Sequence, residues 1–463
     1  MHDTYDAIVI GSGQGGGPLA GRLAKAGRHV ALVEREHVGG TCVNEGCTPT
    51  KTVIASAQVA HLMRRSGDYG VLATDGRKVT VDLERVRRRK RDVVESFRSG
   101  SERSLGGIDD LDLIMGHARF TGPHELAVDL LHGGRRRLSA PVIVVDVGTR
   151  PAVPPIDGID SVPYLTNATL MELGRVPERL VVIGGGYVAA ELGQAFGRFG
   201  SRVTMLQRGS QLLTHEDEDV ANALTDVLRE EGIDVHLNAT VTAVAGDERG
   251  VRVTARVGGS DRTFEGSHLL MAAGRRPNTD DLGLDAAGLA TDEQGFLPVD
   301  ARLRTSLAGV YALGDVTGGP AFTHTSYDDY RILASDLLGD GERRGRDERI
   351  LAYTVFTDPQ LGRVGLTERE AREAGYEVQV ASLPMSHVAR AIETDDTRGL
   401  MKAVVDASTG RVLGAAMLGP EGGELSSALQ IAMLGGLPYT VLRDAPIAHP
   451  TYAESLNNLF AKL

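Results

Sequence analysis

The chain contains an internal repeat that restricts it to one fold class. A short apolar run leads into a glycine-rich turn at 7–16 and again at 181–189, and Gly184 lies 173 residues after Gly11. A second apolar run follows each turn, at 30–33 and 203–206. Strand, G-x-G-x-x-G/A turn, helix and strand together form half of a dinucleotide-binding fold. We therefore predict an α/β protein with two Rossmann-like domains.

The glycines of the two turns are candidate phosphate contacts. They permit a tight turn and a close approach of the backbone, while the following helix directs free N–H groups at a pyrophosphate. The candidates are Gly11, Gly13 and Gly16 in the first copy and Gly184 and Gly186 in the second.

The residue at the end of the second strand distinguishes the two nucleotides. Glu34, in the first copy, is suited to accept hydrogen bonds from a free ribose, as in FAD or NAD. Gln207 takes this place in the second copy and is followed by Arg208. Loss of the acid removes repulsion against a 2′-phosphate, and Arg208 can pair with one, which favours NADPH. In the alternative, Gln207 binds the ribose of NADH and Arg208 points into solvent.

Cys42 and Cys47 are the only cysteines of the 463 residues. A disulfide that closes so short a loop adds little stability to so long a chain, so a reversible redox pair is favoured over a structural bridge. Two inert thiols are the other alternative. We expect both cysteines at the start of a helix, whose dipole favours the reactive thiolate.

Charge and composition exclude several classes of partner. The net charge of -12 argues against a nucleic-acid or anionic-membrane partner. The basic run at 87–91 lies in a helical pattern and is interpreted as a solvated face. No signal peptide or long apolar span is visible, so we expect a cytoplasmic protein without a membrane partner. In the cytoplasm a disulfide is usually transient and catalytic.

Composition changes along the chain predict the domain plan. The first nucleotide-binding domain spans 1–148 and ends before a proline-rich stretch. The second spans 149–274, and residues 275–345 return to the first domain. After a polar run at 339–347, residues 346–463 form an α+β domain.

Three local elements are predicted outside the repeat. Residues 310–316 read as a strand that ends in Gly-Asp, and 401–406 with 412–418 as a hairpin. The final helix is expected over 452–462.

The order of the motifs resembles one enzyme family along almost the whole chain. The motifs are the two dinucleotide turns, Cys42-x4-Cys47-x-Pro49-x-Lys51, Gly314-Asp315 and His449-Pro450-Thr451-Tyr452-Ala453-Glu454. They resemble the FAD-dependent pyridine nucleotide–disulfide oxidoreductases, which include glutathione reductase, dihydrolipoamide dehydrogenase and mercuric reductase. The resemblance implies tightly bound FAD, one per subunit, at the first site and NADPH or NADH at the second. It also implies a homodimer joined through the C-terminal domain, and we assign no metal ligand.

The resemblance assigns the catalytic roles. Cys47 is the sulfur nearest the flavin, and Cys42 is the outer sulfur that attacks the substrate. His449 is implied to shuttle protons beside the outer cysteine of the other subunit, with Glu454 orienting its ring. In the alternative, Glu454 closes a capping box with Thr451 for the final helix.

Further cofactor contacts follow from the same resemblance. Lys51 is implied to reach the N5 edge of the flavin and to pair with Glu191. Tyr187 matches a tyrosine that covers the flavin until NADPH arrives, with ordinary packing as the alternative. The remaining implied contacts are Gly40, Thr41, Gly116, His117, Gly148, Gly274, Gly314 and Asp315.

The acceptor is the least determined part of the prediction. No third cysteine is present, which excludes the four-thiolate relay of mercuric reductases. Residues 322–331 resemble the mercuric-reductase-like branch, which includes a flavoprotein of reactive-chlorine resistance that reduces copper(II). We predict transfer of electrons from NAD(P)H through FAD and the Cys42–Cys47 disulfide to a small disulfide. The alternatives are a copper(II)-type metal-ion or quinone reductase, and a non-enzymatic FAD redox sensor or complex subunit.

Overall fold

The computed structural model describes residues 2–72, 79–247, 250–339 and 345–463. The chain divides into two compact units, each built from three stretches of sequence. Unit 1 comprises Met1–Thr52, Arg87–Ala152 and Arg275–Arg349, and unit 2 comprises Val53–Val86, Val153–Gly274 and Ile350–Leu463. Residues 340–344 of the predicted polar run lie outside the described residues.

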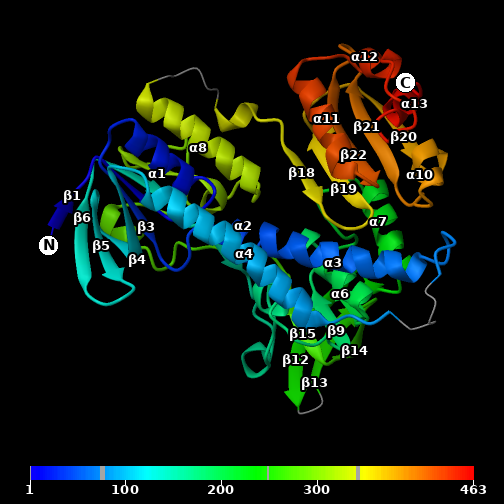
Figure 1. The fold of residues 1–463 in the computed structure, drawn as a ribbon, viewed down its shortest axis with the longest axis horizontal. Helices are drawn as coiled ribbons and strands as arrows, with labels where there is room; N and C mark the ends of the chain where they lie inside the picture. Colours follow the sequence, from blue (N-terminus) through cyan, green and yellow to red (C-terminus); the bar gives the residue numbers. More distant parts are fainter. Residues whose placement is uncertain (1, 73–78, 248–249, 340–344) are drawn as a thin grey trace. The chain divides into compact units, whose positions relative to one another are not determined.

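Unit 1 is built on an eight-stranded sheet (Figure 1). Its strands, in spatial order, are β1 (His2–Thr4), β6 (Arg135–Ser139), β5 (Glu125–Leu130), β4 (Leu111–Gly122), β3 (Val30–Glu34), β2 (Ala7–Ile10), β7 (Val142–Val145) and β17 (Val310–Ala312). From β4 to β17 neighbouring strands are parallel, and Ile10 lies opposite both Val33 and Val145. The carboxyl ends of these strands therefore meet at one edge, where ligands of open α/β sheets bind.

Successive side chains along each strand point to opposite faces of the sheet, and in this sheet both faces are apolar. Val9, Leu32 and Val144 pack with the helices α1 (Gly16–Lys25) and α8 (Thr323–Leu338), which Figure 1 shows side by side. Ile8 and Ile143 point into a second core on the opposite face. The other elements of unit 1 are α2 (Gly40–Asn44), the start of α3 (Cys47–Arg65), most of α4 (Leu83–Gly106), β8 (Thr149–Pro151), β16 (Arg275–Pro277), η2 (Leu284–Ala287), η3 (Gly314–Thr317) and η4 (Arg346–Glu348).

Unit 2 contains the second copy of the repeat. Its parallel sheet has the order β11 (Asp234–His236), β10 (Arg202–Leu206), β9 (Arg179–Ile183) and β15 (His268–Met271). The helices α6 (Tyr187–Phe199) and α7 (Glu218–Glu230) belong to this copy. An antiparallel sheet follows, with β12 (Ala239–Asp247), β13 (Gly250–Val257) and β14 (Ser260–Gly266), and the short helices η1 (Ile159–Ser161) and α5 (Asn167–Leu170) precede the copy.

The C-terminal part of unit 2 is a five-stranded antiparallel sheet with helices. The strand order is β18 (Ala352–Val355), β19 (Gln360–Gly365), β22 (Val412–Gly419), β21 (Leu400–Asp406) and β20 (Val378–Pro384). The helices are α9 (Glu368–Glu373), η5 (Met385–His387), α10 (Ala389–Glu393), α11 (Gly422–Leu434), α12 (Tyr439–Asp444) and α13 (Ser455–Phe460). In the described ranges no helix combines the length and apolar character that a membrane span requires.

Most local predictions are confirmed, and three need correction. The predicted hairpin is formed by β21 and β22. The basic run lies in α4 as expected, but Lys90 is buried, so the run is not solvated throughout. The strand predicted over 310–316 ends at Ala312, because Gly314 turns the backbone with a φ of 70°. The helix predicted over 452–462 is shorter, at Ser455–Phe460.

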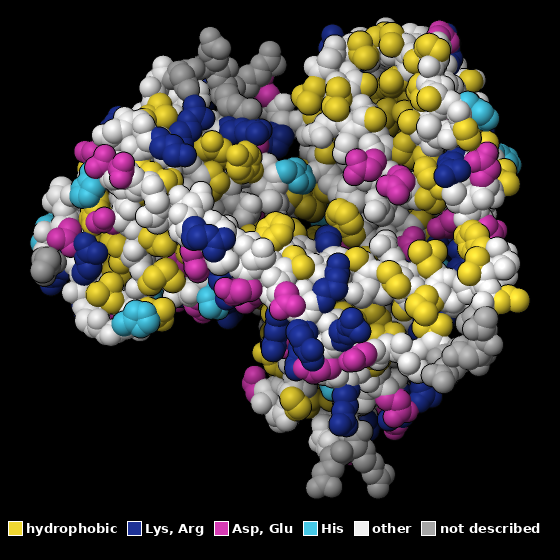
Figure 2. All heavy atoms as spheres, in the orientation of Figure 1, with side chains coloured by type: hydrophobic (Ala, Val, Ile, Leu, Met, Phe, Trp, Pro, Cys, Tyr) yellow, Lys and Arg dark blue, Asp and Glu magenta, His cyan; other side chains and the backbone are white. Residues whose placement is uncertain are grey.

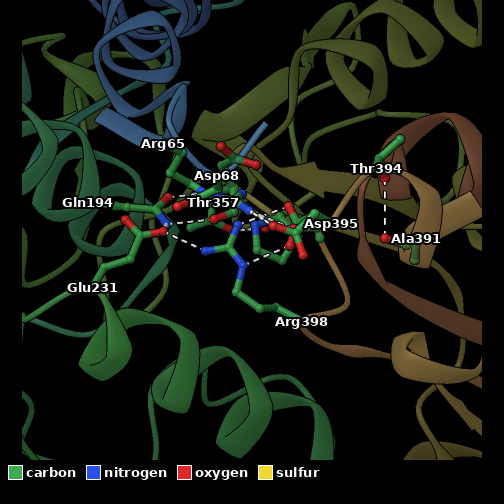
Figure 3. Close-up of polar contacts among 12 residues, drawn as sticks. Arg65, Asp68, Gln194, Glu231, Thr357, Ala391, Thr394, Asp395 and Arg398 are labelled. Atoms are coloured by element: carbon green, nitrogen blue, oxygen red, sulfur yellow. Dashed lines mark hydrogen bonds and ion pairs between the residues drawn. The ribbon is translucent and has the colours of Figure 1, made fainter. Parts of the chain in front are cut away.

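A buried ion network ties the helices of the second repeat to the C-terminal sheet within unit 2. Arg198, on α6, lies 2.5 Å from both Glu231 and Asp358. Figure 3 shows Arg398 directed at Glu231, at 2.7 Å. Burial by itself raises the pKa of Glu231, but the hydrogen bond from Arg198 and the charges of Arg198, His61 and Arg398 lower it below the usual glutamate value. The Glu231 carboxylate is therefore ionised in the folded protein.

Candidate active site

The first glycine turn connects β2 to α1 with no room for side chains. Gly11 has a φ of 101°, and its N–H donates to Val33 O at 2.8 Å. A Cβ on Gly16 would lie 2.2 Å from Gly11 O, and one on Gly40 would lie 2.7 Å from the Cα of Gly13. Real side chains do not tolerate such distances, so the turn stays bare where α1 begins.

Glu34 lies at the carboxyl end of β3, as the ribose prediction requires. Its Oε2 accepts hydrogen bonds from Ser12 N at 3.0 Å and from Ser12 Oγ at 2.6 Å. Its Oε1 accepts from Glu36 N at 2.9 Å. The carboxylate is thereby held against the glycine turn, where a ribose hydroxyl can share it.

Asp315 lies in η3, directly after the sharp turn at Gly314. Its Oδ2 accepts from Thr149 Oγ1 at 3.0 Å, and Thr149 Oγ1 in turn accepts from Arg275 Nε at 2.7 Å. Burial raises the pKa of Asp315 above its usual value, although Arg275 and Thr149 oppose the change. This chain of contacts fixes the orientation of a carboxyl group beside the first nucleotide turn.

The remaining predicted contacts lie in several places. His117 Nε2 is 3.5 Å from Asp281, and a Cβ on the neighbouring Gly116 would meet Asp129 O at 2.6 Å. Gly148 and Gly274 both have positive φ. They directly precede β8 and β16, which pair antiparallel.

The two cysteines lie in separate helices, which corrects the prediction that both begin one helix. Cys42 is inside α2, whereas Cys47 is the first residue of α3. Gly46 N donates to Thr41 O at 2.6 Å and turns the chain between them. Helix-dipole stabilisation therefore applies to the Cys47 thiolate and not equally to Cys42.

The two cysteines differ in their surroundings. Cys47 is exposed and Cys42 is partly buried. Cys47 Sγ lies 3.2 Å from Thr323 Oγ1, at the first residue of α8. The hydrogen bond with Cys47, burial and the charge of Cys47 raise the pKa of Cys42, and Thr323 opposes this only partly. The surroundings of Cys42 therefore disfavour its thiolate form.

An arginine braces the loop between the cysteines. Arg98, on α4, donates from Nε to Asn44 Oδ1 at 2.7 Å. Asn44 Nδ2 donates to Gly40 O at 2.9 Å and to Val38 O at 3.1 Å. The predicted contacts Gly40 and Thr41 lie in the same braced turn, and Thr41 is exposed.

The second glycine turn repeats the geometry of the first. Gly184 has a φ of 124°, and a Cβ there would lie 2.2 Å from Ala272 O. Gly186 caps α6, which begins at Tyr187. Gln207 folds over Gly185 and donates from Nε2 to Gln211 O at 3.1 Å.

Arg208, by contrast, is exposed, and within the described residues it forms no ion pair. The arrangement leaves a free cation beside the second turn, and NADPH use stays a prediction.

Lys51 and Glu191 lie on the predicted helices. Lys51 follows Cys47 by one turn of α3. Glu191 is buried on α6 and accepts from Phe356 N at 2.8 Å. Their mutual pairing stays a prediction, since the two residues belong to different units.

His449 and Glu454 form a pair near the C-terminus. The imidazole is 67% exposed, and its Nδ1 lies 2.9 Å from Glu454 Oε2. Among the described residues, no group hydrogen-bonds to Nε2. Thr451 Oγ1 accepts from Glu454 N at 3.2 Å, but the Glu454 carboxylate does not cap α13. One half of the capping box is therefore present, while the Glu454 carboxylate contacts His449, and the catalytic role of the pair stays a prediction.

Two residues near the cysteines and glycine turns escaped prediction. Thr323 lies in the segment that had been singled out only for its resemblance to one branch. Asp146 directly follows the apolar strand β7 at the carboxyl edge of the sheet, and that position could have marked it.

Comparison with known proteins decides the family. The family model "Pyridine nucleotide-disulphide oxidoreductase" matches residues 5–329, and the model of its dimerisation domain matches residues 351–460. The chain belongs to the pyridine nucleotide-disulphide oxidoreductases. The predicted family is confirmed, and so is the α/β fold with two nucleotide-binding domains and a C-terminal dimerisation domain.

Three relatives show the extent of the similarity. The chain is 39% identical over 462 residues to the probable pyridine nucleotide-disulfide oxidoreductase RclA of Escherichia coli (strain K12), covering 99% of both. Its identity to mercuric reductase of Streptomyces lividans is 37% over 458 residues, covering 98% of this chain and 95% of that protein. The solved Cu(II) complex of the HOCl-induced flavoprotein disulfide reductase RclA from Escherichia coli matches with a TM-score of 0.89 at 38% identity, covering 100% of both chains.

The family is FAD-dependent and uses a pyridine nucleotide, and the first site fits FAD. Gly13 and Gly16 leave the N-terminus of α1 bare, and Glu34 stands at the ribose position. Asp315 and the exposed Cys47 lie in the same unit. By type and position these residues suit the phosphate, the ribose and the redox-active end of such a cofactor, and their individual contacts stay predictions. The chain is therefore a flavoprotein disulfide reductase of this family.

Proposed function

We propose that the protein is an NADPH-dependent reductase of a small disulfide and acts as a homodimer. The observation that carries this proposal is the unequal dithiol. Cys47 forms a hydrogen bond with the Thr323 hydroxyl, whereas the pKa of Cys42 is raised by its hydrogen bond with Cys47. One sulfur is suited to exchange electrons with the cofactor, and the other to attack a substrate once a base removes its proton.

The residues divide the exchange between them. The Cys42 thiolate attacks one sulfur of the substrate, the substrate S–S bond breaks, and the leaving thiolate takes a proton from His449 of the partner subunit. The Cys47 thiolate then attacks the Cys42 sulfur, the mixed disulfide bond breaks, and the second product leaves as a thiolate that takes its proton from solvent while the Cys42–Cys47 disulfide forms. Glu454 holds the imidazole by Nδ1 and leaves Nε2 for proton transfer. FAD, when bound, supplies two-electron transfer between the pyridine nucleotide and this disulfide.

Anaerobic titration with NADPH tests the order of the sulfurs. We expect a long-wavelength charge-transfer absorbance that persists in Cys42→Ser and is absent from Cys47→Ser. Persistence of the band in Cys47→Ser would contradict the assignment. In parallel assays, the His449→Gln variant should turn over the disulfide substrate about 10²–10⁴-fold more slowly, while NADPH should still reduce its flavin at the wild-type rate. If NADPH does not bleach the flavin at all, the non-enzymatic sensor becomes the better explanation.

The coenzyme proposal rests on Gln207 and Arg208. The exposed Arg208 guanidinium suits a 2′-phosphate, and no acid at the end of β10 repels one. We expect kcat/KM to favour NADPH, and Arg208→Glu to reverse that preference. A kcat/KM for NADH well above that for NADPH in the wild type would contradict the proposal.

The homodimer is supported by an apolar surface on the dimerisation domain. Figure 2 shows hydrophobic side chains gathered over α11 and α12, where Ile431, Leu434 and Val441 are exposed. We expect the wild type to be a dimer by light scattering and Ile431→Glu to be a monomer. Leu131→Glu is the control, since this exposed leucine lies after β5 in unit 1. A monomeric wild type contradicts the proposal.

Copper(II) reduction is a second candidate. The similar RclA structure is a Cu(II) complex, and here His324 is exposed next to the threonine that contacts Cys47. Thiolate and imidazole are ligands that copper accepts. This candidate predicts NADPH-dependent copper(II) turnover that survives His449→Gln and is lost in Cys47→Ser. A screen of small disulfides, lipoamide, quinones and copper(II) separates the candidates.

A further inference from the structure

Asp146 carries a buried carboxyl group that lies between the first glycine turn and the Gly314–Asp315 motif. It follows β7 and is only 7% exposed. Its Oδ2 accepts from Gly16 N, at the start of α1, at 2.7 Å. A Cβ on Gly13 would lie 2.7 Å from Oδ2, and one on Gly314 would lie 2.9 Å from Oδ1. Asp146 therefore spans the space between the first glycine turn and the Gly314–Asp315 motif.

The second oxygen of Asp146 is not satisfied by the protein. Among the described residues, no donor hydrogen-bonds to Oδ1. Oδ1 is not among the fully enclosed side-chain atoms that lack a partner, so this oxygen opens onto the space beside the glycine turn, while the residue as a whole is buried. Ionisation of a carboxyl group that is buried to this extent is costly unless several donors stabilise it. One N–H on one oxygen suits a neutral acid, whose second oxygen carries a proton and donates it.

The surrounding charges favour the same state. Burial raises the pKa of Asp146 well above its usual value, the bond from Gly16 N lowers it, and the charges of Asp315, Asp329 and Glu34 raise it further. Asp329 is paired with Arg349, and Arg275 acts on Asp315. No cation pairs with Asp146 itself in the described part of the chain.

We propose that Asp146 keeps a proton in the folded enzyme and is an FAD-binding residue that donates a hydrogen bond from Oδ1 to an anionic oxygen of the cofactor. A pyrophosphate requires donors, and an ionised aspartate beside Asp315 would repel it. The proton therefore makes an acid behave like an asparagine at this position. This inference rests on the proposed location of FAD at the first glycine turn.

The variants Asp146→Asn and Asp146→Ala distinguish three possibilities: that Asp146 is protonated and donates a hydrogen bond, that it is ionised, and that it only fills space. FAD affinity is measured by titration of the full-length protein after reversible removal of the cofactor. Asparagine keeps an acceptor for Gly16 N and a donor for FAD, so its Kd should stay within about threefold of wild type, while alanine should weaken binding by about tenfold or more. Wild-type affinity should fall at alkaline pH, where the proton is lost, and that of Asp146→Asn should not.

The opposite results overturn the inference. They are an asparagine variant as weak as the alanine variant, an alanine variant as tight as wild type, or a wild-type pH profile as flat as that of Asp146→Asn. Thermal unfolding without FAD is an independent readout. Because the folded pKa is raised, the stability due to this proton is complete below the ordinary aspartate value and is lost as the pH rises toward the folded value. The Tm of Asp146→Asn should thus exceed that of wild type by more at neutral pH than at pH near 4. If wild type binds no FAD but this Tm difference appears, the proposed FAD location fails and the protonation of Asp146 stands.

Discussion

The contact between Thr323 and Cys47 allows a quantitative test of the dithiol. The hydroxyl lies 3.2 Å from the sulfur and donates to it once Cys47 is a thiolate. A hydrogen bond to a charged group contributes about 1.5–3 kcal/mol. Since about 1.4 kcal/mol moves a titration midpoint by one pH unit, Thr323→Val should raise the pH midpoint for Cys47 by about one to two units.

The assay is the rate of alkylation by iodoacetamide as a function of pH. It is carried out in a Cys42→Ser background, because two interacting thiols titrate as a pair and not as separate groups. Valine keeps the shape of threonine and removes only the hydroxyl. Thr323→Ser keeps the hydroxyl and is the matched control, with a midpoint close to that of the parent.

Equal midpoints for the valine and serine variants would refute the role of Thr323. A shift in both variants would instead indicate that the methyl group and its packing control the thiol. The expected result is a shift in the valine variant alone, which would show that the Thr323 hydroxyl favours the Cys47 thiolate.

Three further predictions follow from the structure. Gly16→Ala should abolish FAD retention, because its Cβ would lie 2.2 Å from Gly11 O. Gly17→Ala is the control, since its Cβ would have its nearest contact at 3.5 Å, and it should retain FAD. The measurement is the flavin absorbance of the two purified variants, and equal retention would contradict the steric argument. Glu231→Gln should reduce the free energy of unfolding in urea by about 3–5 kcal/mol because it leaves Arg198 and Arg398 without their shared carboxylate, with the exposed Glu230→Gln as control. The folded pKa of Glu231 is lowered, so this difference should be present above the ordinary value of 4.5 and should shrink as the pH falls through the folded value; a constant difference would argue against an ionic origin. Glu454→Gln should slow turnover of the disulfide substrate but not reduction by NADPH, and slowing of both steps would speak against an orienting role for Glu454.

Local patterns were sufficient for much of the fold and part of the site. The two glycine turns and the hairpin depend on residues adjacent in sequence, and backbone sterics act over the same short range. The strand predicted at 310–316 is longer than the observed one, because the apolar residues reach Leu313 while the backbone already leaves the strand after Ala312 and turns at Gly314. The placing of both cysteines at one helix start also failed, since the turn at Gly46 depends on a contact with Thr41 O.

By itself, the sequence determined the repeat, the redox pair and the family, because each is carried by residue types at fixed spacing. Only the tertiary structure decided what surrounds these motifs. Thr323 meets Cys47 across 276 positions, and Asp146 reaches Gly16 across 130. The Glu454 carboxylate, which sequence left between two uses, lies on His449. The physical reason is that hydrogen bonds and pKa values depend on the direction of side chains brought together by folding, and spacing along the chain does not specify that direction.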